Sequence, residues 1–331
     1  MSVQQGRVCP LSYQHGPRGV SRAVERCAPA LWVAGGLYGN VEAADALLAA
    51  LDADRPGGER PLLVLNGDFH WFDADPGEFR ALEQRLADHV RLAGNVEAEL
   101  GSPSAQAGCG CAYPAFVDDA TVARSNAIME RLQATVAELE GMPQRLAGLP
   151  RLLRVRVGTA IIGIIHGDPD SLAGWGLAVE SLATSGGPTD GPRVREWARQ
   201  AGVDGFACSH TCLPWMGAPG GIPVANNGSA GMPNFRGCLH GLATRIAPVQ
   251  APRGDAVYSM EALGLRFEAI PLHYDRQAWR TRFERLWPPG SPAHESYYTR
   301  ITEGPAFEAA AAAPGPRVPP GLRGRRSMPC T

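Results

Sequence analysis

The chain has 331 residues, 44% of them hydrophobic, and a formal net charge of −2, so it can form one large domain or two small ones, and its overall charge argues against a nucleic-acid partner. All 31 basic residues are arginines, which excludes a lysine Schiff base and the lysine of a P-loop. No apolar run reaches the roughly 18 residues of a membrane helix, and the N-terminus lacks an apolar signal segment, so we expect a cytoplasmic protein without a membrane partner.

Residues 1–28 are rich in proline, glycine and arginine, and they predict an irregular N-terminal extension. After it, short apolar runs alternate with segments whose apolar residues recur at helical spacing, which predicts parallel βαβ units. The expected elements are a strand at 31–34, a helix that starts at the N-cap Asn40, a strand at 62–65, a helix at 78–90 and a third strand that ends at Gly94-Asn95. Ligands of such sheets gather at the carboxyl ends of the strands.

The second half of the chain is predicted to add a second sheet around a helical insertion at about 100–150. The expected strands are 153–157, 159–165 and 205–208, with a helix at 193–202 and several short strands up to residue 272. Parallel units followed by antiparallel strands favour a two-sheet α/β sandwich flanked by helices. We therefore predict a main domain at 29–272, a C-terminal appendage at 273–305 and a disordered tail at 306–331.

Four polar signatures stand at the ends of predicted strands. They contain Asp68 in NGD, Asn95 in AGNVE, His166 in HGD and His210 in SHT. A carboxylate, an amide oxygen and two imidazoles suit a divalent metal ion of hard to borderline character. Any one of these residues alone is more typical of a turn or of a structural histidine, so the prediction of a metal site depends on all four together.

The order of these motifs resembles that of the calcineurin-like metallophosphoesterases, most closely their small bacterial branch. The matching runs are GGLYGN, NGD, GNVE, HGD, SHTC and NNGSAG, over about residues 31–235 with connecting strands to about 272. The resemblance implies a four-layer α-β-β-α sandwich, here with a helical insertion and a C-terminal extension. It also implies a hydrolase for phosphate esters or nucleotides that uses Mn, Fe or Zn ions.

In the family, two metal ions share one aspartate, and this sequence departs from that pattern on one side only. The resemblance assigns Asp68, Asn95, His166 and His210 to one ion, with Asp68 and His210 in catalytic roles. The three positions that serve only the other ion hold Gly36, Tyr38 and Cys212 in place of an aspartate and two histidines. The sequence therefore predicts a modified site with one metal ion, and two ions stay open as the alternative.

Other groups are candidates to replace the missing ligands. Cys212 could bind a metal ion, Tyr38 could coordinate an ion or hydrogen-bond a phosphate oxygen, and His70 could face the same cavity because it lies two residues after Asp68. A surface-loop histidine is the alternative for His70. Val96 stands where many relatives of the family carry a catalytic histidine.

Further residues are candidates to support the ligands from behind. We expect Asn40 and Asn227 in this role, and Asp168 either orients His166 or is a plain turn residue. Cys109 and Cys111 are one residue apart, so they are either two ligands of one metal ion or buried inert thiols. In a cytosolic protein, the eight cysteines favour free thiols or metal ligands over a disulfide framework.

Three functions remain in competition at this point. The first is a metal-dependent hydrolase of phosphate esters with a modified site. The second is a non-catalytic relative that uses the fold as a binding or interaction module, and the third is a thiolate site with other chemistry. The sequence does not decide whether the insertion is a lid or an oligomer surface, so homo-oligomers stay open.

Overall fold

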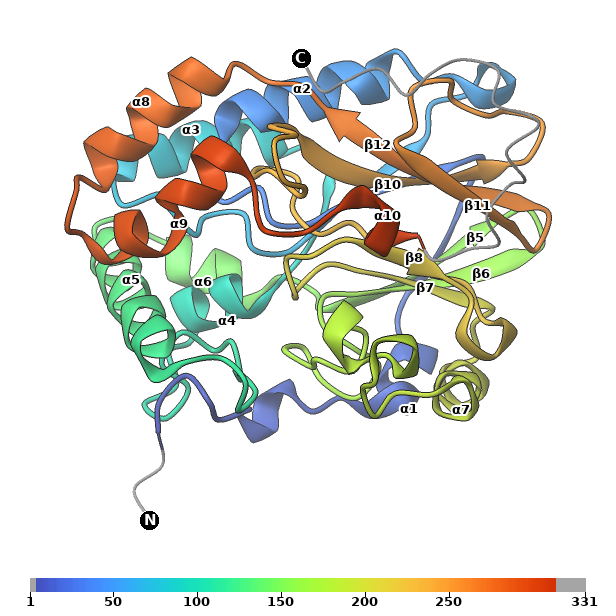
Figure 1. Ribbon diagram of the computed structural model, residues 1–331, viewed down its shortest axis with the longest axis horizontal. Coiled ribbons are helices and arrows are strands. Elements are labelled where there is room, and N and C mark those ends of the chain that lie inside the picture. Colours follow the sequence, from blue (N-terminus) through green and yellow to red (C-terminus); the bar gives the residue numbers. More distant parts are fainter. Residues whose placement is uncertain (1–3, 314–331) are drawn as a thin grey trace.

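The computed structural model describes residues 4–313, which form two six-stranded sheets packed face to face (Figure 1). The space between the sheets is filled by apolar side chains such as Val33, Val64, Ile162 and Ile164. Helices cover the outer faces of both sheets. The predicted four-layer sandwich is therefore confirmed.

The first sheet combines parallel and antiparallel pairs. In spatial order its strands are β1 (Glu25–Ala28), β5 (Leu152–Val157), β6 (Ala160–Ile165), β7 (Gly205–Cys208), β9 (Val224–Asn226) and β8 (Trp215–Gly217). Strands β6, β7 and β9 run parallel. Their carboxyl ends, which carry the HGD and SHT motifs, therefore lie at one edge.

The second sheet has the same organisation. In spatial order its strands are β11 (Tyr258–Ala262), β12 (Leu265–Leu272), β10 (Gly241–Pro248), β2 (Leu31–Ala34), β3 (Leu62–Asn66) and β4 (Val90–Leu92). Strands β2, β3 and β4 run parallel. Leu31 and Val33 point into the space between the sheets, whereas Trp32 and Ala34 pack under the outer helices. Coverage on both faces explains why β2 reads as a continuous apolar run.

The outer helices bury one apolar stripe each against a sheet. On the second sheet these helices are α2 (Val41–Asp52) and α3 (Pro76–Leu86), and on the first sheet they are α1 (Gly16–Ser21) and α7 (Gly191–Ala201), whereas α8 (Arg276–Leu286) packs beside α2. In α7, Val194 and Trp197 pack on Phe206 and Cys208 of β7. The helix predicted at 193–202 is thus confirmed.

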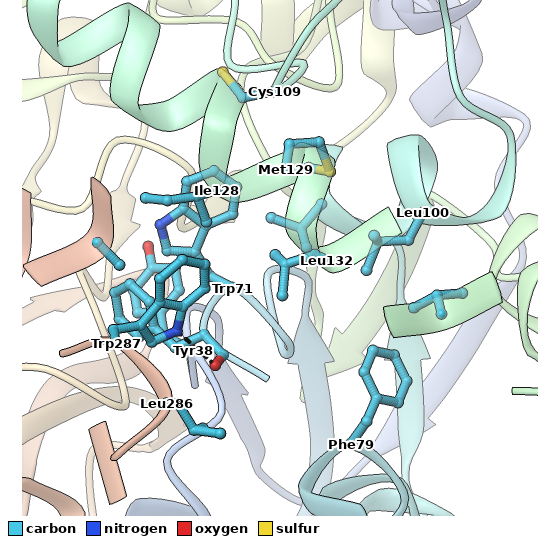
Figure 2. Close-up of a cluster of buried hydrophobic side chains, with 14 of the residues drawn as sticks. Tyr38, Trp71, Phe79, Leu100, Cys109, Ile128, Met129, Leu132, Leu286 and Trp287 are labelled. Atoms are coloured by element: carbon cyan, nitrogen blue, oxygen red, sulfur yellow. Dashed lines mark hydrogen bonds between the residues drawn. The ribbon is translucent and has the colours of Figure 1, made fainter. Parts of the chain in front are cut away.

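A third group of helices stands at the end of the sandwich where the parallel strands finish (Figure 1). It contains α4 (Asn95–Gly101), α5 (Asp119–Ala137), α6 (Met142–Ala147) and α9 (Pro292–Glu303). Figure 2 shows the hydrophobic cluster under these helices, in which Ile128 and Leu132 of α5 share a core with Tyr38, Trp71 and Trp287. The residues around 100–150 therefore cover the strand ends instead of projecting away from them.

Two terminal segments differ from their predicted irregularity. Before residue 29, the chain forms α1 and also β1, which pairs in parallel with β5. Residues 306–313, assigned to a disordered tail, contain α10 (Ala309–Ala312), and Ala312 is buried in the core between the sheets. The first segment is ordered because β1 pairs with β5 and Val20 of α1 is buried, and the second because Ala312 is buried. The rest of the predicted tail lies outside the described residues.

No helix among residues 4–313 is long and apolar enough to cross a membrane.

Candidate metal centre

The four predicted metal ligands meet at the carboxyl ends of the parallel strands. Asp68 follows β3, Asn95 starts α4 after β4, His166 follows β6 and His210 follows β7. All four side chains are buried, with 1–6% of each residue exposed. Residues separated by up to 142 positions in the chain are thus neighbours, because both sheets end their parallel strands at the same place.

The distances place these groups around one point. Asp68 Oδ1 lies 3.4 Å from His166 Nε2, and Asn95 Oδ1 lies 3.2 Å from the same nitrogen. The ligand atoms of Asp68, His166 and His210 all lie within 4.8 Å of one another. Asn95 donates its amide N–H to Cys109 O at 3.1 Å, which leaves its oxygen directed at the site. One carboxylate, one amide oxygen and two imidazoles are therefore within reach of a single ion.

Each imidazole is oriented by a backbone carbonyl. His166 Nδ1 donates to Asn66 O at 2.7 Å, and His210 Nε2 donates to Cys111 O at 3.2 Å. His210 Nδ1 is buried and has no hydrogen-bond partner. A carbonyl on one ring nitrogen and a bare lone pair on the other is the arrangement of a metal-binding histidine. The donor set present here fits a divalent ion.

Electrostatics favour the metal-binding protonation states of His210 and Asp68. Burial, together with the neighbouring His166, lowers the pKa of His210 to about 3, so this ring is neutral. Burial alone would raise the pKa of Asp68, but the neighbouring His166, through its charge and its hydrogen bond, holds that pKa below its usual value. Burial would likewise lower the pKa of His166, but the Asp68 carboxylate raises it above its usual value. The site thus contains an ionised carboxylate beside two imidazoles.

Glu97 holds the loop that carries Asp68, and the sequence analysis missed it. Its Oε2 accepts the N–H groups of Asp68 and Gly94, each at 2.8 Å, and its Oε1 accepts the N–H of Phe69 at 2.8 Å. Asp68 needs such support because its φ of 57° lies in the left-handed region, which is unfavourable for a residue with a Cβ atom. The available signal was the glutamate three residues after Gly94, which is the spacing of a capping box.

The three replaced positions form one packed unit. Tyr38 Oη lies 2.8 Å from Cys212 Sγ, and a Cβ atom built on Gly36 would lie 2.8 Å from the ring of Tyr38. The Tyr38 ring therefore occupies the space into which a side chain at position 36 would extend. Arg300 Nη2 donates to Cys212 O at 2.6 Å and fixes the other end of the pair. Tyr38 and Cys212 both have left-handed φ values, 54° and 61°.

His70 does not reach the site, and both predictions for it were wrong. It is fully buried, with Nδ1 2.7 Å from Asp73 Oδ2 and Nε2 3.1 Å from Glu83 Oε1. Its ring stacks on Phe79 with centroids 3.6 Å apart. Both ring nitrogens are hydrogen-bonded to carboxylates, so His70 has no free nitrogen for a metal ion. Because it is fully buried, it is not a surface residue either.

Two of the predicted supporting residues, Asn227 and Asn40, lie behind the site. Asn227 joins the loops behind the site, because its Oδ1 accepts from Ser209 Oγ at 2.7 Å and its Nδ2 donates to Gly35 O at 3.0 Å. Asn40 caps α2 through Ala43 N and donates to Gly231 O at 2.8 Å. These two residues brace the loops without contacting the four candidate ligands.

Asp168 does not orient His166. Its carboxylate accepts the backbone N–H groups of Asp170, Ser171 and Gly176 at 2.8–3.0 Å. It therefore organises the loop after β6, which agrees with the turn alternative.

Among the described residues, the cysteine pair forms no metal cluster with other side chains. Cys109 and Cys111 are buried, and within residues 4–313 no cysteine belongs to a group of three close metal-binding side chains. Burial raises the pKa of the Cys111 thiol well above its usual value, so it stays protonated. Cys109, Cys111 and Cys212 are free thiols, whereas Cys238 is disulfide-bonded and departs from the expectation of free cysteines.

A cavity of about 50 Å³ opens over the candidate ligands. Its walls are mostly aromatic side chains and thiols. The lining residues are Tyr38, Asp68, Trp71, Asn95, Val96, Cys111, Tyr113, Trp175, His210, Cys212 and Tyr297. The sequence analysis missed the four aromatic residues at 71, 113, 175 and 297, because the last three come from segments outside the motifs.

Comparison with solved structures identifies the fold. A hypothetical protein from Pyrococcus horikoshii OT3 aligns with a TM-score of 0.55 and 17% identity, over 85% of this chain and 100% of its own. A metallophosphoesterase from Sphaerobacter thermophilus aligns with a TM-score of 0.52 and 16% identity, over 84% of this chain and 100% of its own. No family profile and no curated protein matches the sequence. The chain therefore has the metallophosphoesterase fold.

Proposed function

We propose that this chain is a metal-dependent hydrolase of a phosphate ester, related to the calcineurin-like metallophosphoesterases, with a site for one divalent ion. The observation that carries the proposal is His210, whose Nδ1 is buried and unpartnered and which offers a ligand atom within 4.8 Å of those of Asp68 and His166. A buried polar atom without a partner costs about 1–3 kcal/mol, and binding of an ion removes that cost. Asn95 Oδ1 supplies the fourth ligand atom.

The chain's own residues have defined roles in such a site. A divalent ion bound there supplies Lewis-acid polarisation of a phosphoryl oxygen and lowers the pKa of a water molecule. Asp68 and His210 would hold the ion that activates the reacting group, and the carbonyls of Asn66 and Cys111 fix the two imidazoles. Glu97 keeps the Asp68 backbone in its strained conformation.

One ion is proposed instead of two because of the unit that Tyr38, Cys212 and Gly36 form. In this unit, the Tyr38 hydroxyl is hydrogen-bonded to the Cys212 thiol. Burial raises the pKa of that thiol, so it stays protonated. These three positions supply no carboxylate or imidazole, so they offer no set of metal ligands comparable to Asp68, Asn95, His166 and His210. The same observation favours a second candidate, a non-catalytic protein that keeps the fold and one ion and binds its ligand without hydrolysing it.

Metal analysis of the purified full chain tests the proposal. We expect one equivalent of Mn, Fe or Zn per chain, loss of this ion in His166→Ala and His210→Ala, and retention in His273→Ala, whose histidine is exposed outside the site. Two equivalents would contradict the single-ion site. Turnover of bis(p-nitrophenyl) phosphate that requires the ion supports the hydrolase, whereas one tightly bound ion without turnover favours the non-catalytic candidate.

A further inference from the structure

The cavity over the candidate ligands has a buried floor and a half-exposed mouth. Asp68, Asn95 and His210 form the floor, whereas Tyr113 and Trp175 are only partly buried. Trp175 is held in place because its Nε1–H donates to Cys111 O at 2.9 Å. The mouth is thus built from fixed aromatic side chains.

Aromatic rings continue from this mouth to the solvent. The Trp175 ring lies edge-on to His210, with centroids 5.4 Å apart, and Tyr113 lies 5.9 Å from Trp175. Phe116 packs edge-on against Trp175 at 6.0 Å, yet 62% of it is exposed. An exposed phenyl ring beside a cavity is apolar surface available to a ligand.

The size of the cavity separates the phosphoryl group from the rest of a substrate. A volume of about 50 Å³ holds only a few water molecules, at roughly 10–15 Å³ each in this measure. A nucleoside does not fit inside. The organic group of the ester must therefore stay at the mouth of the cavity. Because the ring of Trp175 lies close to that of His210, the part of this group nearest the phosphate contacts the aromatic rings.

Charge limits the phosphate as well. Within residues 4–313, Asp68 is the only acidic residue that lines the cavity, and no arginine of that part of the chain lines it. The nearby Arg300 does not line the cavity, and it donates hydrogen bonds to the carbonyl oxygens of Cys212 and Pro233. With a divalent ion present, the lining has one net positive charge, which complements a monoanion better than a polyphosphate.

We propose that Tyr113, Phe116 and Trp175 form a binding subsite for the aryl group of a monoanionic aryl phosphodiester. This inference rests on the proposed function for its phosphate half, because the ion would hold that half. The aryl half rests on the three rings alone.

Calorimetric titration of the metal-loaded full chain tests the subsite, with diphenyl phosphate and diethyl phosphate as matched monoanionic probes. We expect diphenyl phosphate to bind roughly tenfold tighter, the upper end of what aromatic contacts give. Phenyl phosphate, a dianion at pH 8, is expected to bind more weakly than diphenyl phosphate, and equal or tighter binding overturns the monoanion part.

Two variants and one control locate the preference. Phe116→Ala removes an exposed ring without risk to the core, and we expect it to lower the ratio of the two affinities at least twofold. Trp175→Leu is expected to bring the ratio close to one, whereas Leu11→Ala, which removes a side chain on a residue 83% exposed, leaves it unchanged. The subsite is overturned if the unmodified chain has a ratio close to one. It is also overturned if Phe116→Ala and Trp175→Leu keep the ratio of the unmodified chain.

The two proposals fail in different ways. Selective aryl binding without any hydrolysis of aryl phosphodiesters supports the subsite and refutes the hydrolase. Hydrolysis of both probe types with equal affinities refutes the subsite and leaves the hydrolase standing.

Discussion

The packing of Tyr38 against Gly36 makes a sharp prediction for the substitution Gly36→Ala. The new Cβ atom would lie 2.8 Å from two carbons of the Tyr38 ring and 2.9 Å from its hydroxyl oxygen. The ring cannot move aside easily, because Tyr38 is only 4% exposed, its ring packs against Phe72, and its hydroxyl is hydrogen-bonded to the Cys212 thiol. The substitution therefore tests whether Tyr38 fills the space that an acidic side chain at position 36 would need.

Two costs add in this variant. Gly36 has a φ of 69°, and a residue with a Cβ atom pays about 1–2 kcal/mol in the left-handed region. Overpacking of a well-filled site costs about 1–3 kcal/mol more. We expect Gly36→Ala to lower the free energy of unfolding by about 2–5 kcal/mol in total. When the ring is removed by Tyr38→Ala, only the backbone cost of about 1–2 kcal/mol should remain.

Urea denaturation of the two single variants and the double variant measures this coupling in a double-mutant cycle. Tyr38→Phe is the matched control, because it keeps the ring and removes only the hydroxyl, so Gly36→Ala should stay costly on that background. If Gly36→Ala costs the same with and without the Tyr38 ring, the ring does not fill the space and the single-ion argument loses its structural basis.

Three further predictions concern buried and half-buried groups. The pKa of His70 is raised to about 9, because its bonds to buried carboxylates outweigh the opposing effect of burial, so its stabilising contribution of about 3 kcal/mol is complete below pH 6.5 and is lost as the pH rises through 9. His70→Gln should flatten the dependence of unfolding free energy on pH between 6.5 and 9, and an unchanged slope would contradict the buried imidazolium. Arg245 lies 2.7 Å from Asp54 and 2.5 Å from Glu268 in a buried cluster, so Arg245→Leu should destabilise the fold by about 3–5 kcal/mol in urea denaturation, with a loss below 1 kcal/mol as the opposing result. Cys212→Ser should leave metal content unchanged in elemental analysis, since Cys212 is not grouped with the metal-binding side chains, and loss of the ion would revive the thiolate site.

Sequence reasoning located the candidate ligands well. Asp68, Asn95, His166 and His210 stand directly after buried strands, and parallel strands bring their carboxyl ends to one edge. This inference needs only the order of strands and helices, which apolar periodicity gives. The departure at Gly36 was readable from the sequence as well, although the filling of that space by Tyr38 was not.

The tertiary structure decided the surroundings of these ligands. The spacing of His70 from Asp68 suggested a shared cavity, but the left-handed φ of Asp68 breaks the extended backbone on which a two-residue spacing depends. His70 therefore turns toward Asp73 and Glu83 on its own side of the loop. The local sequence does not encode this reversal, because it is stabilised by Glu97 from the next strand–helix unit.

The walls of the cavity were decided by packing alone. Trp175 and Tyr297 reach the site from elements far apart in the chain, and no local pattern marks them as neighbours of His210. The sequence by itself determined the sandwich and the four polar groups at its strand ends, since these follow from periodicity within short segments. Only the tertiary structure determined which side chains enclose them, because that depends on contacts between segments whose relative position no local spacing fixes.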